Sequence, residues 1–76
     1  MDLLEQVADA LAKDVLEAVR VTGDEDIVNQ VMKSVGASST TLEEAFLTAV
    51  RIRRAEARGR VLLDELVKLR TQKTDG

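Results

Sequence analysis

The chain has 76 residues and a formal net charge of −3, with no Cys, His, Pro, Trp or Tyr and a single Phe. Without Cys and His it has neither a thiolate nor an imidazole to bind a metal, and it lacks the side chain that ordinarily carries protons near neutral pH. We therefore expect no enzyme activity, no cofactor and no metal site.

The first predicted helix covers residues 3–21. Asp2 is a suitable N-cap residue, and Glu5, three positions later, completes a capping box. Gly23 is a suitable C-cap, because glycine adopts positive φ without a Cβ clash. The apolar residues recur at helical spacing on one face: Leu4, Val7, Leu11, Val15, Ala18 and Val19.

The second predicted helix is short and covers residues 25–35. Asp24 is expected to cap it, and the acidic residues that follow oppose the positive end of the helix dipole. Gly36 is expected to end it.

The third predicted helix is long, running from a cap at Thr40 or Thr41 to about Thr71, with Glu43 or Glu44 at the capping-box position. Its ~30 residues give a length of roughly 45 Å. Gly59 inside it costs about 1 kcal/mol relative to Ala. Residues 1–70 would then form a single helical domain, and the polar residues 71–76 a disordered tail.

These elements predict an all-α fold, in which two shorter helices in series pack antiparallel on a long C-terminal helix. The apolar stripe of the long helix turns by roughly a quarter turn or more between its two halves, so one partner helix cannot easily cover both. We expect its distal part, LLDELVKL, to pack on a second copy as a helical-bundle or coiled-coil homodimer. Self-association would use Leu62, Leu66 and Leu69, unless the first helix covers them within one chain.

Five arginines lie in the run RIRRAEARGR, residues 51–60. Some belong to a series of alternating charge at helical spacing, which predicts an exposed ladder of ion pairs. The members of the ladder are Arg53, Glu56, Arg60, Asp64 and Lys68.

A second arginine stripe, Arg51, Arg54 and Arg58, lacks a nearby counter-charge on its own helix, where only Glu65 lies near one end. Its guanidinium groups can bind the acidic surface of the same chain, an acidic protein or second copy, or the phosphates of a nucleic acid. Residues 1–44 hold ten acidic and three basic groups, a net of −7, whereas residues 45–76 hold four acidic and eight basic, a net of +4. That asymmetry favours a contact within or between chains.

The function we expect is a non-enzymatic helical protein-interaction module, such as a small regulator or adaptor. Its partner-binding face would contain Arg51, Arg54 and Arg58, with Leu47 and Val61 beside them. Arginine rimmed by exposed aliphatic side chains is typical of interface hot spots. The protein partner is not identified by the sequence.

The alternative is a DNA-binding regulator of the helix-turn-helix type, spanning residues 27–46 with Gly36 as the turn glycine. Glu43 and Glu44 on the would-be recognition helix repel phosphates, and a pI of about 4.8 is low for a DNA-binding domain. Nucleic acid is therefore a possible partner that the sequence does not favour.

No apolar run approaches the ~20 residues that a membrane-spanning helix needs. The first residues include Asp2 and Glu5, where a signal peptide would carry positive charge. We therefore expect a cytoplasmic protein that does not bind membranes.

Overall fold

The structure is a computed structural model that describes the backbone of residues 1–74 and the side chains of residues 1–72. It contains three α-helices: α1 (Leu3–Thr22), α2 (Asp26–Ser38) and α3 (Thr40–Thr74). Helices α1 and α2 both pack on the long α3, and the described residues form no strand. The predicted three-helix fold is confirmed.

The two ends of α1 are fixed by the predicted residues. Asp2 caps the helix, because its Oδ1 accepts a hydrogen bond of 2.8 Å from the amide of Glu5. Gly23 adopts a left-handed φ of 75°, and its amide donates to the carbonyl of Val19 at 2.7 Å. This geometry is the reason that a glycine stands at position 23.

Helix α2 begins at Asp26, one residue later than predicted, and its N-cap residue is Glu25 instead of the predicted Asp24. Asp24 Oδ1 still accepts a hydrogen bond of 3.0 Å from the amide of Asp26, the first residue of the helix. The prediction that Gly36 ends the helix is wrong, because α2 continues to Ser38. Gly36 does not adopt positive φ. It lies instead under the carboxylate of Glu43, where a Cβ atom would collide. Because that carboxylate is the far end of a flexible side chain, it can move away from an added Cβ atom at little cost.

Helix α3 starts after a single connecting residue, Ser39, whose backbone is extended. Its Oγ accepts a hydrogen bond of 3.1 Å from the amide of Leu42. The cap is therefore Ser39 rather than Thr40 or Thr41, and no glutamate occupies a capping-box position. At its other end α3 passes the predicted limit of Thr71 and stays helical through Thr74. The last two residues of the predicted tail, 75 and 76, lie outside the described residues.

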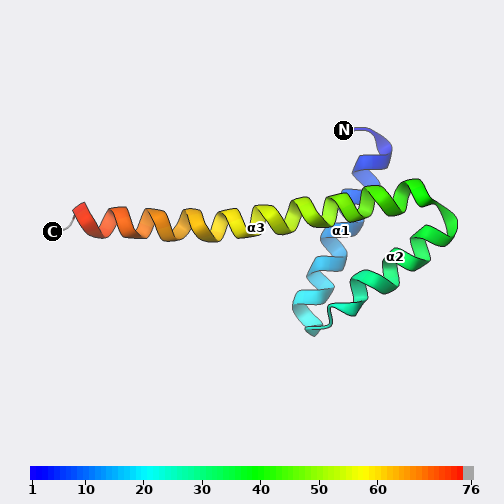
Figure 1. Cartoon of the computed structure of the whole chain (residues 1–76), viewed down its shortest axis with the longest axis horizontal. Helices are drawn as coiled ribbons and strands as arrows, with labels where there is room; N and C mark the ends of the chain where they lie inside the picture. The colour runs from blue at the N-terminus through cyan, green and yellow to red at the C-terminus, as the bar shows by residue number, and fades with distance from the viewer. Residues whose placement is uncertain (75–76) are drawn as a thin grey trace.

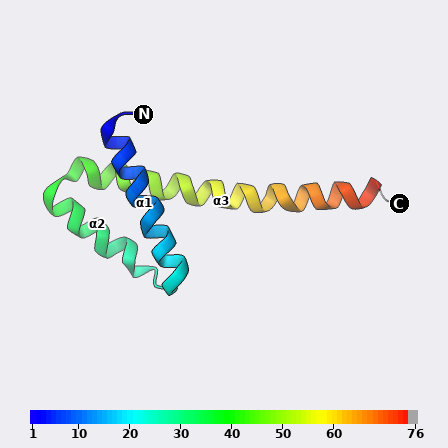
Figure 2. The same ribbon diagram turned by 180° about the vertical axis from the view of Figure 1, so that it is seen from behind.

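The three helices form a compact head, residues 1–57, in which α2 runs back beside the first part of α3 and α1 crosses that part (Figures 1 and 2). Phe46 is fully buried at the centre. Around it lie small and branched side chains, which suit the narrow space between helices: Ala12, Val15, Val28, Ala49 and Val50.

The rest of α3, residues 58–74, projects from the head as an arm (Figure 1). The structure extends 59 Å along its longest axis and 29 and 13 Å along the other two. Every described side chain from Ala55 to Gln72 is exposed, so α1 does not cover the distal half of α3 within the chain. None of the described helices is apolar over a stretch long enough to span a membrane. The cytoplasmic location stays a prediction.

Candidate protein-interaction surfaces

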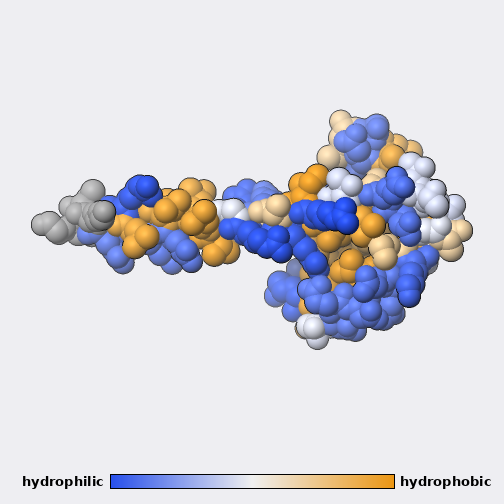
Figure 3. All heavy atoms as spheres, in the orientation of Figure 1, coloured by the Kyte–Doolittle hydropathy of each residue, from blue (hydrophilic) through white to orange (hydrophobic). Residues whose placement is uncertain are grey.

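The arm carries an uncovered apolar stripe, formed by Leu62, Leu66 and Leu69. Their exposed fractions are 55%, 36% and 58%, although leucine is normally buried. At 100° per residue, Leu62 and Leu66 lie about 160° around α3 from Phe46. The stripe therefore faces away from the head, and Figure 3 shows apolar side chains concentrated on the arm.

The predicted partner-binding face is continuous along α3. Its five residues recur at alternating steps of four and three, which places them on one side of a helix. Arg51, Arg58 and Val61 are exposed, whereas Leu47 and Arg54 are half-buried.

Among the side chains that the structure describes, only one of the three arginines in this face has a counter-charge. Arg54 Nη2 lies 2.7 Å from Glu25 Oε2, at the start of α2. Neither Arg51 nor Arg58 forms an ion pair with any side chain that the structure describes. The acidic surface of the same chain therefore satisfies Arg54, and the two exposed arginines can bind something else.

Arg53 has a role that the sequence did not predict. Its Nε and Nη2 donate to Asp9 Oδ1 and Oδ2 at 2.7 and 2.8 Å, a bidentate pair that joins α3 to α1. These hydrogen bonds hold the pKa of Asp9 below its ordinary value, and the charge of the guanidinium group adds a smaller effect in the same direction. Hydrogen bonding to Asp9 also raises the pKa of Arg53. The ladder prediction is therefore wrong for Arg53, although Arg60 does pair with Glu56 at 3.0 Å.

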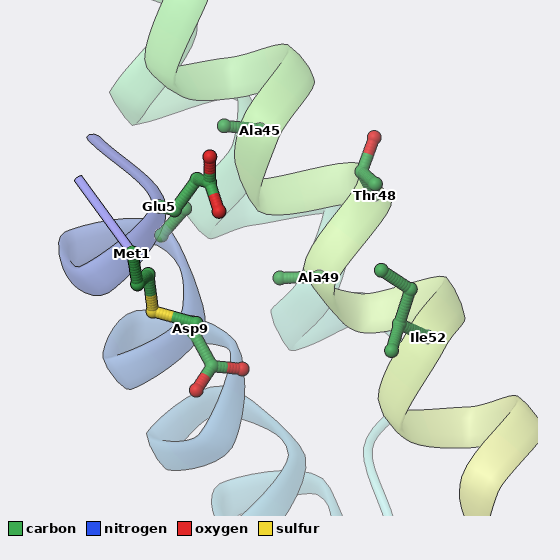
Figure 4. Close-up of a pocket in the computed structure, with 8 residues that line it drawn as sticks. Met1, Glu5, Asp9, Ala45, Thr48, Ala49 and Ile52 are labelled. Carbon is green, nitrogen blue, oxygen red and sulfur yellow. The ribbon is translucent and has the colours of Figure 1, made fainter. Parts of the chain in front are cut away.

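A groove of about 300 Å³ lies between the N-terminal half of α1 and the N-terminal half of α3 (Figure 4). Its α3 wall consists of Ala45, Thr48, Ala49 and Ile52, and Ile52 is 63% exposed. Its α1 wall consists of Met1, Glu5, Ala8 and Asp9. The groove was not predicted from the sequence, because it exists only where two helices cross.

The described residues contain no group of three acidic, His or Cys side chains that could hold a metal ion. Comparison of the chain with protein-family models, curated proteins and solved structures gave no match. The exposed surfaces of α3 are therefore the candidate functional sites among the described residues.

Proposed function

We propose that this protein is a non-enzymatic helical interaction module, which self-associates through the arm and binds an acidic protein partner through the face around Arg51 and Arg58. The observation that carries the proposal is the uncovered leucine stripe. A small monomer rarely exposes a contiguous apolar strip, and such strips commonly mark protein contacts.

Burial of the stripe would favour association. Fully burying one leucine side chain contributes about 1.5–3 kcal/mol, and a symmetric contact buries Leu62, Leu66 and Leu69 from both copies. These contributions oppose the loss of translational and rotational freedom on association. The head alone should have a small free energy of unfolding, because its core contains one aromatic ring and otherwise small or branched residues.

Sedimentation at micromolar concentration tests self-association. The unaltered chain should show twice the mass of one chain, and Leu66→Glu should show one. Lys68→Glu is the control, because it reverses a charge on the same arm beside the stripe. A mass of one chain for the unaltered protein would contradict this half of the proposal.

The arginine face supports a second contact. Arg51 and Arg58 are exposed and lack an ion pair with any described side chain, and Arg58 lies one turn from the exposed, aliphatic Val61. Charged rims of this kind guide association with an acidic surface. Charge reversal at Arg51 tests this contact without breaking an ion pair of the head.

Affinity capture with cross-linking would compare the unaltered chain with Arg51→Glu and with Lys33→Glu. The second variant is the control, because it reverses the charge of an exposed side chain on α2. A partner lost with Arg51→Glu and kept with Lys33→Glu supports the arginine face. Equal recovery by all three proteins would remove it from the proposal.

The DNA-binding alternative stays a prediction. The connection between the two helices is Ser39 alone, because Gly36 is inside α2, whereas helix-turn-helix units use a turn of about 3–4 residues. Fluorescence anisotropy with mixed duplex DNA tests it directly. Binding that weakens steeply as salt rises would support phosphate contacts, and no binding at low salt would exclude them.

A further inference from the structure

We infer that two copies associate antiparallel through α3, so that the arm of each copy ends at the α1–α3 groove of the other. The inference rests on the self-association half of the proposed function and adds the orientation, the register and the docking site. Four features of α3 and the head support it.

The first feature is a seam of uncharged residues along the exposed side of α3. They recur at alternating steps of three and four, the a and d spacing of a left-handed coiled coil. The seam lies on the side of the helix away from Phe46, so a second helix can approach without meeting α2. Its positions are Ile52, Ala55, Gly59, Leu62, Leu66 and Leu69.

The second feature is the pair of small residues at the centre of the seam. No other part of the chain comes within 4 Å of where a Gly59 side chain would begin, so packing inside one copy does not explain this glycine. In a parallel pair, Ala55 and Gly59 would each face themselves and leave a gap. In the antiparallel pair they face Leu66 and Leu62 of the second copy, so that small residues oppose large ones.

The third feature is the charge beside the seam. When Gly59 faces Leu62 of the second copy, Arg58 lies opposite Glu65 of that copy, and symmetry repeats the pair. A register shifted by one heptad toward the C-terminus would instead place Glu65 opposite itself. Charge therefore selects one register from the two that bury the leucines.

The fourth feature is the groove. In the selected register Leu69 of the second copy meets Ile52, which is exposed at the groove edge. Arg70 of that copy then lies toward the groove wall that contains Glu5 and Asp9. Antiparallel pairing also brings the basic half of each chain to the acidic half of the other, whereas parallel pairing would set the two acidic halves together.

Cross-linking distinguishes the orientations, because the natural chain contains no cysteine. Ala55→Cys and Leu66→Cys would be made in two chains that differ in tag length. Along one helix these positions are about 16 Å apart, whereas a disulfide needs Cβ atoms about 3.5–4.5 Å apart. An antiparallel pair should cross-link only in the mixture of the two variants.

Each outcome has a distinct meaning. Cross-links in the mixture alone support the inference. Cross-links of each variant with itself would show a parallel pair, which overturns the inference but keeps the proposed self-association. Failure of every mixture to cross-link, with sedimentation at the mass of one chain, would overturn both.

Charge reversal checks the register. Arg58→Glu should raise the dimer dissociation constant by at least about tenfold, because two attractive pairs become repulsive. Adding Glu65→Arg should restore the constant to within about threefold. In a parallel pair the new arginine would instead face Arg70 of the second copy, and the double variant would remain weak.

Discussion

Arg53 holds Asp9 through two parallel hydrogen bonds of 2.7 and 2.8 Å, although the residues are 44 positions apart in the chain. The pair joins α3 to α1 at the groove where the helices cross. About a third of each side chain is exposed, less than in the pair between Arg60 and Glu56. Because it is partly buried and bidentate, we expect this ion pair to stabilise the fold more than the pair between Arg60 and Glu56 does.

Arg53→Met should lower the melting temperature of the head, because it leaves the carboxylate of Asp9 without its partner. Arg60→Met is the matched control, since it removes the same group from an exposed pair within α3. It should change the melting temperature little. Thermal unfolding of the two variants side by side measures the difference, and equal melting temperatures would contradict a structural role for Arg53.

The same pair predicts a pH dependence. Since the pKa of Asp9 is held below its ordinary 3.8, the folded chain binds this proton less readily than the unfolded chain. The stabilisation is complete above the ordinary value and is lost as pH falls through the lower folded value. Asp9→Asn should therefore differ most from the unaltered chain near neutral pH, and the two should converge below about pH 3.8.

Urea unfolding from neutral pH to about pH 2 measures this convergence as a difference in free energy. Taking the difference removes the common effects of Glu17 and Asp26, whose pKa values are lowered by hydrogen bonds from Arg20 and Gln30. A gap that stays constant down to the lowest pH would show that Asp9 does not act through its charge.

Phe46→Ala should unfold the head of a single chain. Truncation of a buried phenylalanine costs about 3–5 kcal/mol, which is close to the whole stability expected of a domain this small. Leu3→Ala is the control, because Leu3 is 75% exposed. Far-UV circular dichroism should show a large helix loss for Phe46→Ala and little for Leu3→Ala.

Substitution by alanine should destabilise the chain at Gly23 and stabilise the helix at Gly59. Gly23→Ala should destabilise by about 1–2 kcal/mol, because position 23 has a left-handed backbone. Gly59→Ala should increase the helix content of a single chain, since alanine is favoured by about 1 kcal/mol inside a helix and the site is open.

Measurements on Gly59→Ala at low and at high protein concentration distinguish the effect of position 59 on the helix of a single chain from its effect on association. Helix content at nanomolar concentration reports the single chain, where it should rise. Sedimentation at micromolar concentration reports association, which should weaken if Gly59 permits the close approach of a second α3. Stronger association would show that the glycine has no packing role.

The sequence predicted the parts of the fold that depend on neighbouring residues. Asp2 and Gly23 act within one helical turn, so their residue types were enough to locate both ends of α1. The prediction that Gly36 ends α2 was wrong, because residue type alone does not distinguish a glycine with positive φ at a helix end from a glycine inside a helix.

The candidate surfaces were predictable only in part. Spacing along α3 was enough to group Arg51 with Arg58 and Leu62 with Leu66. It could not show that Arg53 turns to Asp9, because that pair depends on the crossing of α1 and α3. Opposite net charges of the two halves indicated contacts between them but not which residues would meet.

The arm has a consequence for how the chain unfolds. Residues 58–74 are held by hydrogen bonds within α3 and by little else, and they lack the tertiary packing that supplies most of the stability of helices in proteins. In a single chain the arm should fray gradually from its free end, with fast amide exchange, while the head opens cooperatively. A second copy along the arm would make the fraying segment part of one cooperative transition.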